Sequence, residues 1–371
     1  MFIHPVRTKH DLKSFIGLPY TLYRDDPLWV APLRSEQWSQ FNPVKNPMLE
    51  HCTYQLFLLK EGDKVLGRIS AFTDRLALDH WQQPIGLFGS FECVNDPVAA
   101  SMLLDAAATW LRVQGMQVMR GPWSFASQEW GLVVEGFEPQ PVILAPYNPP
   151  YYNNFMTGFG LSKVMDLLVY EADMQKGYRI PERILTLTER IAQRYGVRVR
   201  PIDMNHLEAD VVTIMRLANQ SISDNWGYYP VTDAEARAMA HDLKQIVNPE
   251  ALLLAEDASG EPIGFALSLP DVNQVLKGLN GRLLPFGWLK MLIELPKLKV
   301  YRMWALGVVP EYQGKAIDTL LYRATHDALA QLNVRMEINY VLENNDRMNN
   351  AIVKLGATVI RRYRVYDKKI L

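Results

Sequence analysis

The chain has 371 residues, which exceeds one typical domain and predicts two domains with sizeable hydrophobic cores. Its 39 basic and 40 acidic residues give a formal net charge of −1, so the overall charge does not favour DNA or another polyanion as a partner. Two cysteines cannot form a disulfide framework, and the seven histidines are too scattered to indicate a metal site. Because we find neither a signal core nor an apolar run of membrane-spanning length, we expect a cytoplasmic protein with no transmembrane segment.

The first half of the chain alternates between short strands and helices. Apolar alternation with β-branched and aromatic residues indicates strands, and apolar residues three and four apart indicate helices. Residues 61–64 suit a hairpin turn, and Asp96 followed by Pro97 suits the start of a helix. Gly17 and Pro19 predict a kink or break in the first helix. These patterns predict strands at residues 3–7, 54–59, 65–72 and 87–94, and helices at residues 11–23 and 97–111.

Residues 120–150 form a long stretch rich in glycine, proline and aromatic residues. It runs into the tyrosine-rich sequence YNPPYY at residues 147–152, and a strand that ends at Tyr170 follows. Loops of this length often carry function. The tyrosines either line a substrate cleft or form a packing surface between two lobes, and the sequence leaves both interpretations open.

The second half of the chain continues the same alternation. Residues 224–230 form a polar and aromatic loop that contains Trp226 and Tyr228. Thr232 and Glu235 match a capping box, which predicts the start of a helix after this loop. The remaining patterns predict a link followed by a helix over residues 175–194, with Pro181 in its first turn. They also predict a helix at 208–221, a strand at 197–202, and a hairpin with strands at 251–256 and 263–269.

Residues 271–299 form an insertion where a short turn between two strands is expected. Long insertions inside a compact domain tend to be functional. Asp271, Asn273 and Asn280 are the polar residues of the insertion best placed to face a substrate. The insertion either covers a substrate site, contacts a lipid surface, shelters the apolar chain of a ligand, or packs as a helical pair between two lobes. It is apolar with interspersed basic residues, namely Lys277, Arg282, Lys290, Lys297 and Lys299.

A strand, a tight turn and a helix follow the insertion and predict an anion site. Residues 302–309 alternate as a strand that Pro310 ends, and the leucines and alanines of residues 320–329 recur at helical spacing. Free N–H groups and the helix dipole attract anions at such a helix start. Gly314 and Ala316 let a diphosphate approach the backbone, and Gln313 and Lys315 can add hydrogen-bond donors. On chemistry alone, this turn suits a nucleotide as well as another diphosphate.

The sequence Val308-x-Pro310-x-x-Gln313-Gly314-x-Ala316 resembles the acyl-CoA pyrophosphate loop of the GNAT acetyltransferase superfamily, whose usual form is V-x-P-x-x-[QR]-G-x-[GA]. The downstream pattern is similar as well: a strand at 336–342, a helix opened by Asn345 that closes with KLGA at 354–357, and a last strand at 362–368. The phrases YNPPYY, LPDVNQ and VLENN resemble those of bacterial tandem-GNAT proteins.

This resemblance implies an α/β (α+β) fold of two tandem GNAT-like lobes, each a mixed, mostly antiparallel twisted sheet flanked by helices. It implies a degenerate N-terminal lobe at residues 1–173, a connecting helix at 174–196, and an acyl-CoA-binding C-terminal lobe at 197–371 that carries the insertion. In the first lobe the corresponding turn, at residues 94–100, lacks the Gln-Gly-x-Ala sequence, and its Asp96 would repel a diphosphate. We therefore expect acyl-CoA to bind the second lobe.

The resemblance also implies an acyl-CoA-dependent N-acyltransferase that transfers an acyl group directly from acetyl-CoA, or a longer acyl-CoA, to an amine of a small molecule or peptide. Trp226, Tyr228, Asp271 and Asn273 are the candidates for binding the acceptor. The residues that match cofactor-binding positions of the family are Leu306, Val308, Gln313, Gly314, Lys315, Ala316, Ile317, Asp318 and Asn345.

The chain departs from the family pattern at the catalytic positions. The family often has a glutamate on its fourth strand, but residues 303–305 offer no carboxylate, and Ile352 stands where the family's general-acid tyrosine is usual. Glu343 is our candidate base and Tyr340 our candidate acid, although a glutamate at the start of the next helix also explains Glu343. Asp318 would lie near the diphosphate, which opposes tight CoA binding.

Two alternatives follow from these departures. One is an aminoacyl-tRNA-dependent transferase similar to the Fem peptidyltransferases, which the balanced charge and the Gln-Gly-x-Ala turn disfavour. The other is a non-catalytic acyl-CoA-binding or scaffold protein, which the missing base and acid favour. Neither the acceptor nor the oligomeric state follows from the sequence.

Overall fold

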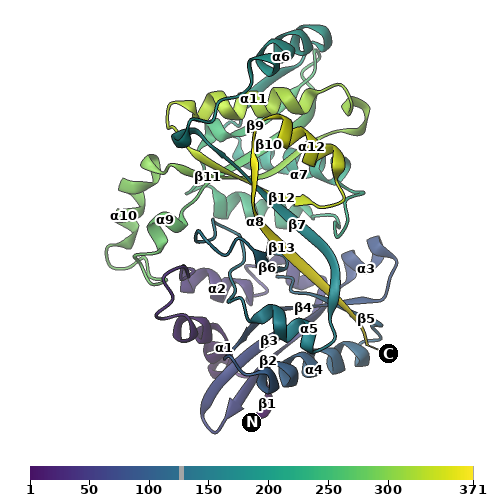
Figure 1. The fold of residues 1–371 in the computed structure, drawn as a ribbon, viewed down its shortest axis with the longest axis vertical. Coiled ribbons are helices and arrows are strands. Elements are labelled where there is room, and N and C mark those ends of the chain that lie inside the picture. The colour runs from purple at the N-terminus through teal and green to yellow at the C-terminus, as the bar shows by residue number, and fades with distance from the viewer. Residues whose placement is uncertain (125–128, 371) are drawn as a thin grey trace. The chain divides into compact units, whose positions relative to one another are not determined.

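The computed structural model describes residues 1–124 and 129–370, so residues 125–128 of the glycine- and proline-rich stretch lie outside the described part. Each of its two compact units contains a mixed sheet with helices packed on it (Figure 1). The predicted α/β fold class is therefore confirmed. Unit 1 consists of Met1–Asp166, Leu276–Trp288 and Arg361–Leu371, and unit 2 consists of Leu167–Val275 and Leu289–Ile360.

The sheet of unit 1 has the strand order β1-β2-β3-β4-β5-β13, and β6 also pairs with β13. Its neighbouring strands are antiparallel except for β4 and β5, which are parallel. The strands are β1 Phe2–Pro5, β2 Cys52–Glu61, β3 Lys64–Asp74, β4 Ile85–Cys93, β5 Val118–Gly121, β6 Leu132–Glu135 and β13 Thr358–Lys369. The helices are α1 Lys9–Leu22, α2 Arg34–Gln40, the short 3-10 helix Pro47–Glu50, α3 Arg75–Trp81, α4 Pro97–Val113 and α5 Tyr152–Gly158.

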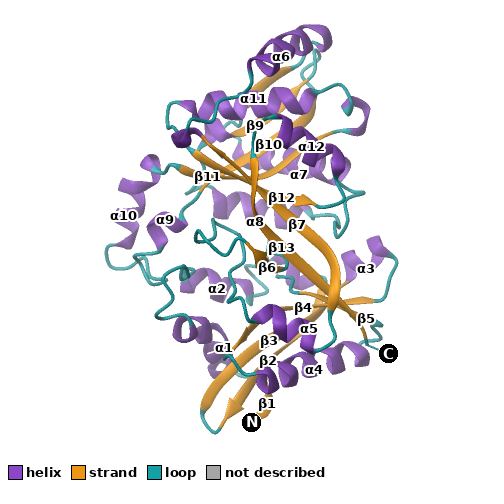
Figure 2. Cartoon of the chain, viewed as in Figure 1, coloured by secondary structure: helices purple, strands orange, loops and turns teal. Residues whose placement is uncertain are grey.

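Helix α4 forms a hydrophobic core of unit 1 by packing on this sheet (Figure 2). Asp96 Oδ1 accepts a hydrogen bond from Val98 N at 2.8 Å, so the predicted helix start is confirmed. Leu103 is fully buried in this core. A Cβ on Gly67 of β3 would lie 2.5 Å from Leu103 Cδ1, so the absence of a side chain at Gly67 allows the close approach.

Helix α1 continues through Pro19, so of the kink or break predicted from Gly17 and Pro19, the break is wrong. Proline has no N–H group to donate to the carbonyl four residues earlier, which is that of Phe15. In the structure, Arg68 Nη1 donates to Phe15 O at 2.9 Å. A buried guanidinium on β3 therefore supplies the hydrogen bond that the helix itself lacks.

The sheet of unit 2 has the strand order β7-β12-β11-β10-β9-β8 and is antiparallel except for β11 and β12. The strands are β7 Ser162–Asp173, β8 Arg198–Pro201, β9 Leu252–Glu256, β10 Pro262–Pro270, β11 Val300–Val308 and β12 Arg335–Leu342. The helices are α6 Glu182–Tyr195, α7 Leu207–Ser221, α8 Asp233–Leu243, α11 Ile317–Ala330 and α12 Asp346–Lys354. The short helices α9 Asn273–Leu276 and α10 Gly287–Glu294 each contain residues of both units. Single 3-10 turns lie at Met174–Lys176, Pro249–Ala251, Leu295–Lys297 and Pro310–Tyr312.

Each unit takes one strand from the other half of the sequence. In unit 2, β7 pairs with β12, with Ala172 opposite Met336. In unit 1, the last strand of the chain, β13, pairs with β5, with Tyr366 opposite Gly121. Each unit is therefore made of strands that pair with one another, and these strands do not all come from one continuous part of the sequence.

The insertion forms two short helices, α9 and α10, and the 3-10 turn Leu295–Lys297. Its ends are anchored, because Val275 and Leu298 are buried. Within the described residues, no helix combines the length and the apolar character that crossing a membrane requires.

Candidate functional site

Strands β11 and β12 of unit 2 separate part of the way along their length. Their parallel pairing starts at Val300 and ends where Met303 lies opposite Ile338, although both strands continue beyond that level. On its other edge, β11 has a bulge at Trp304, because Leu267 and Ser268 of β10 pair with Ala305 and Met303. A bulge bends the strand that contains it. The separation leaves backbone N–H and C=O groups of both strands available for a ligand that enters between them.

A buried asparagine lies at this separation. Asn339 directly follows the last paired residue, Ile338, and is 2% exposed. Within the described part of the chain, neither Oδ1 nor Nδ2 of Asn339 has a hydrogen-bond partner, and the same holds for Ser268 Oγ at the β10 bulge. Buried amides without partners are rare and indicate a function or a bound group. The sequence analysis missed Asn339, although a polar residue inside the run INYVL was a usable signal.

Charged side chains surround the start of the separation. Glu337 and Arg302 are both fully buried and lie opposite each other in the β11–β12 pairing. Arg335 Nη2 donates to Glu337 Oε1 at 2.8 Å, and Arg335 Nη1 donates to Glu171 Oε2 at 2.9 Å. Burial lowers the pKa of Arg335, but the two carboxylates outweigh it and the pKa is raised. Glu337 is thus already held in an ion pair, which favours a structural role for it.

Tyr340, the predicted catalytic acid, lies on β12 directly after Asn339. The Arg302 guanidinium carbon is 5.1 Å from the centre of the Tyr340 ring, so a cation lies over this half-buried tyrosine. Glu343, the predicted base, is half-buried in the turn between β12 and α12. Asn345 Oδ1 accepts a hydrogen bond from Met348 N at 3.1 Å, so its side chain caps α12. The roles of Tyr340, Glu343 and Asn345 stay predictions, and the contact that the structure shows for the Asn345 side chain is the cap of α12.

The predicted anion turn is open and carries the required backbone conformation. Gly314 and Ala316 have φ angles of 78° and 60°, in the left-handed region that favours glycine. A Cβ on Gly314 would meet no atom within 4 Å. Ala316 is the N-cap residue of α11, and no side chain caps this helix. Its first N–H groups are therefore available to an anion.

Three side chains around this turn affect how well it can bind an anion. Lys315 Nζ lies 4.3 Å from the centre of the Tyr312 ring and 5.6 Å from that of Tyr195, which keeps a cation beside the turn. Gln313 Nε2 donates to the carbonyl of Val308 at 3.0 Å, so this amide supports the turn. Asp318 lies in the first turn of α11, where its charge opposes an anion.

The other predicted cofactor positions lie on β11 and α11. Leu306 is half-buried and Val308 is buried, and they pair with Ala266 and Gly264 of β10. Ile317, the first residue of α11, is 1% exposed and faces the core, so only its backbone is available to a ligand. These positions place the separated part of β11 next to the open turn in sequence.

The predicted acceptor residues are held by their own loops. Tyr228 Oη donates to Asn219 Oδ1 of α7, and burial raises the pKa of Tyr228. The hydrogen bond of Tyr228 fixes its loop to α7. Trp226, in the same loop, is half-buried. Asp271 is 2% exposed at the end of β10, and its Oδ1 accepts a hydrogen bond from the backbone N of half-buried Asn273 at 3.2 Å. The assignment of these four residues to the acceptor stays a prediction.

Unit 1 contains a buried polar cluster that the sequence analysis missed. Glu92, on β4, accepts hydrogen bonds at Oε2 from the hydroxyl groups of Tyr23 and Tyr152, the latter at 3.0 Å. Arg68 Nη2 lies 3.7 Å from Glu92 Oε1. Burial raises the pKa of Glu92, and the neighbouring Arg68 offsets this only in part. The cluster ties β4 to α1 and α5, and it includes Tyr152 of the YNPPYY sequence.

Another cluster in unit 1 contains atoms that can ligate metals. His51, Cys52 and Asp74 each place a potential ligand atom within 4.8 Å of the others. Asp74 Oδ1, however, accepts hydrogen bonds from His51 Nδ1 and from Leu76 N, both at 2.9 Å, the latter as the cap of α3. Burial raises the pKa of the Cys52 thiol to about 11, so it is protonated at neutral pH. These contacts favour a hydrogen-bonded structural cluster.

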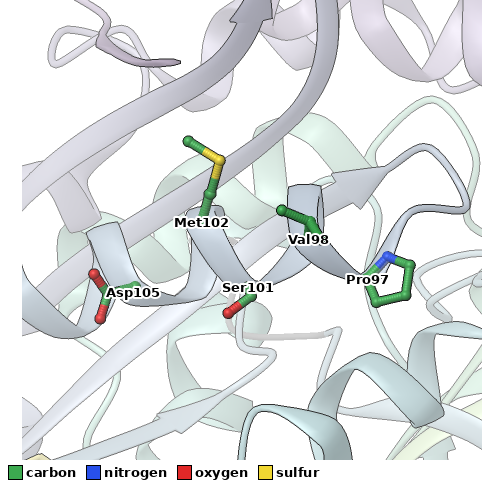
Figure 3. A pocket seen from close by; sticks show the side chains of 5 residues that line it. All are labelled: Pro97, Val98, Ser101, Met102 and Asp105. Atoms are coloured by element: carbon green, nitrogen blue, oxygen red, sulfur yellow. The ribbon is translucent and has the colours of Figure 1, made fainter. Parts of the chain in front are cut away.

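Two surface hollows also lie in unit 1. The first, of about 410 Å³, follows one face of α4 and is lined by Pro97, Val98, Ser101, Met102 and Asp105 (Figure 3). One helix alone lines it, so it lacks the converging polar groups of a binding site. The second, of about 600 Å³, is lined by residues that include Tyr151 and Asn153, with Arg364 at its edge. Neither hollow includes the turn or the separated strands of unit 2.

Comparison with known proteins identifies relatives along the whole chain. The sequence is 35% identical over 378 residues to the "Bacterial ceramide synthase" of Caulobacter vibrioides, covering 99% of this chain and 97% of that protein. It is 33% identical over 371 residues to "Protein YghO" of Escherichia coli, covering 98% of this chain and 94% of that protein. No protein-family model matches the sequence.

Comparison with solved structures identifies the fold. A tandem GNAT protein from the clavulanic acid biosynthesis pathway matches with a TM-score of 0.61 at 12% identity, covering 100% of this chain and 98% of that one. A GCN5-related N-acetyltransferase from Sphaerobacter thermophilus matches with a TM-score of 0.54 at 12% identity, covering 100% and 95%. The predicted resemblance to tandem-GNAT proteins is therefore confirmed at the level of the fold.

Proposed function

The chain belongs to the family of the Caulobacter vibrioides bacterial ceramide synthase, and we propose that it is an acyl-CoA-dependent N-acyltransferase that acylates a long-chain amine. The observation that supports this most directly is the pairing of an open, left-handed turn at Gly314 with the separated end of β11 in unit 2. The tandem GNAT fold supports acyl transfer, and the relative's name suggests the acceptor class.

The turn and the separated strands fit the two ends of an acyl-CoA molecule. The backbone N–H groups at the start of α11 and the Lys315 ammonium would hold the diphosphate, with Gly314 leaving room for it. Backbone groups of residues 304–308 would bind the pantetheine arm, whose amides need partners of the kind that a separated strand offers. The Asn339 amide, buried and without a partner in the described residues, would bind a polar group close to the thioester.

The acceptor in this proposal is the primary amine of a long-chain amino alcohol, because a ceramide is the amide of such a base with a fatty acid. An alkylammonium has a pKa of about 10.4, so one proton must leave before the nitrogen attacks. In our assignment the Glu343 carboxylate takes this proton, directly or through water, and Tyr340 Oη protonates the leaving thiolate. Acyl-CoA supplies the activated carbonyl, which gains the C–N bond as its C–S bond breaks.

The purified protein, an acyl-CoA and a long-chain amino alcohol provide the test. We expect release of one free thiol for each amide formed, measured by a colorimetric thiol reagent and by mass spectrometry. Glu343→Gln should lower kcat, whereas Asp346→Asn, in the next helix, is the matched control and should leave kcat unchanged. Thiol release that no acceptor stimulates would remove the transferase assignment.

A non-catalytic acyl-CoA-binding protein is the second candidate. The absence of a carboxylate at residues 303–305 and the position of Asp318 favour it. The unfolding temperature, measured with acetyl-CoA, palmitoyl-CoA or ATP, reports which ligand binds, and the thiol assay reports whether acyl transfer follows. Together they distinguish the acyltransferase from the binding protein. A ligand that binds only the native state at a hundredfold excess over its Kd adds about 2.7 kcal/mol of stability. Stabilisation by a CoA ester without amide formation would support the binding protein.

A further inference from the structure

The segment around α10 exposes an unusual number of apolar side chains. Large apolar residues exposed singly are normal on protein surfaces, but contiguous groups of them indicate interaction sites. Six of the 14 large apolar side chains that are exposed among the described residues fall within ten consecutive positions. They are Leu284 at 78%, Phe286 at 75%, Leu292 at 64%, Ile293 at 50%, Trp288 at 49% and Leu289 at 43%.

The helical geometry of α10, Gly287–Glu294, gathers four of these six side chains on one face, whereas Leu284 and Phe286 come just before the helix. Residues four apart lie on the same side of a helix, so Trp288 aligns with Leu292, and Leu289 aligns with Ile293. Gly287, on the opposite side, is buried. Among the described residues, no helix or strand packs extensively against α10. The apolar face of this helix therefore points away from the protein that anchors it.

Positive charge accompanies the apolar face. Arg282, Lys290, Lys297 and Lys299 are exposed within residues 282–299. The same stretch contains one carboxylate, that of Glu294, whose Oε1 lies 3.2 Å from Lys297 Nζ. Four cations against one carboxylate leave an excess of three positive charges beside the apolar side chains, on a chain whose formal net charge is −1.

We propose that residues 284–299 bind the surface of an anionic lipid bilayer, with α10 lying in the plane of the interface. Phenylalanine, tryptophan and leucine on one face with lysine or arginine beside it is the composition of interfacial helices. The lysines would contact lipid phosphates while the apolar side chains enter the boundary between head groups and acyl chains. A second copy of the chain is the alternative occupant, but lysine is depleted in the cores of protein interfaces.

The anchoring of the segment suits this role. On the N-terminal side, the carbonyl of Gly281 accepts a hydrogen bond from Arg34 N at 3.0 Å. On the C-terminal side, Leu298 is buried. A short exposed helix fixed at both ends can enter a bilayer surface without unfolding its surroundings. This inference does not depend on the proposed acyl transfer, because it concerns surface binding alone.

Co-sedimentation of the full-length protein with vesicles tests the proposal. We expect binding to phosphatidylcholine vesicles that contain about 30 mol % phosphatidylglycerol, and about tenfold weaker binding to phosphatidylcholine alone. The triple variant Phe286→Ser, Trp288→Ser and Leu292→Ser should lower the partition coefficient at least about tenfold. The double variant Lys290→Glu and Lys299→Glu should remove the preference for phosphatidylglycerol.

Matched controls place the same changes elsewhere on the surface. Val98→Ser with Val113→Ser removes two exposed apolar side chains of α4, and Lys13→Glu with Lys64→Glu reverses two exposed lysines of unit 1. Both controls should bind vesicles as the wild type does. Equal sedimentation of the triple serine variant and the wild type would overturn the proposal. A wild-type dimer that the serine variant dissociates, measured by light scattering and with no vesicle binding, would instead assign the face to a second copy.

Discussion

Replacement of Gly314 by aspartate is the sharpest test of the anion turn. Gly314 has a φ of 78°, and a Cβ built there would meet no atom within 4 Å, so a larger side chain meets no steric obstacle. Aspartate tolerates the left-handed region better than most residues, at a cost of about 1 kcal/mol in the free energy of unfolding. The variant therefore keeps the fold and places a carboxylate where the proposal puts a diphosphate.

The expected loss of affinity follows from Coulomb's law. A carboxylate about 5 Å from a group with two negative charges is repelled by about 1.7 kcal/mol in a fully water-like dielectric, and by more at the lower effective values near a protein surface. A change of 1.7 kcal/mol raises the dissociation constant about 17-fold. Isothermal titration of the wild type and Gly314→Asp with CoA measures this difference directly. We expect the affinity of the variant to fall by this factor or more, and the loss to shrink at high salt.

Two controls separate charge from shape and from backbone strain. Gly314→Asn has the same shape as the aspartate variant without its charge, so it should retain most of the affinity. Gly115→Asp introduces the same residue at an open glycine of unit 1, whose φ is 82° and where a Cβ would likewise meet no atom within 4 Å. It should lose a similar amount of stability and no affinity. Unchanged CoA binding by Gly314→Asp would refute the assignment of the turn, and equal losses in the aspartate and asparagine variants would refute the electrostatic explanation.

Three further outcomes follow from the buried polar groups. Asn339→Leu should raise the free energy of unfolding by about 1 kcal/mol in urea titrations, since it removes a buried amide without partners in the described residues, and should slow thiol release. Arg68→Met should lower the free energy of unfolding by about 2 kcal/mol in urea titrations, because the Phe15 carbonyl would lose its hydrogen-bond donor. Burial raises the pKa of Glu92, so stability should fall as pH rises from about 4.3 through the folded-state pKa. Glu92→Gln should remove this fall when Tm is measured against pH.

Local chemistry made the turn and its helix predictable from the sequence. Pro310 ends β11, and Gly314 with Ala316 supplies the left-handed conformations that start α11. The cap at Asp96 and the capping box of Thr232 with Glu235 were predictable for the same reason, because each depends on residues within one turn of helix. Features fixed by neighbours in sequence need no knowledge of the rest of the fold.

Long-range contacts were not predictable in this way. The continuation of α1 through Pro19 depends on Arg68, which is 49 residues further along the chain and donates to Phe15 O. The pairing of β13 with β5 joins segments that alternate like any other strand, and nothing in either segment specifies its partner. Glu92 was missed for a related reason, since its burial and its two tyrosine partners come from separate elements.

The candidate catalytic groups predicted from the sequence lie on β12 and in the turn after it, and not on β11. β11 provides backbone groups and no carboxylate at residues 303–305, whereas β12 and the turn after it contain Asn339, Tyr340 and Glu343 within five positions. Glu337, two residues before Asn339 on β12, already forms an ion pair with Arg335. A ligand entering between the separated strands would therefore meet hydrogen-bonding backbone on one side and titratable side chains on the other. Under the proposed function, this division would let the unit lack a glutamate at residues 303–305 and still supply groups for proton transfer from β12.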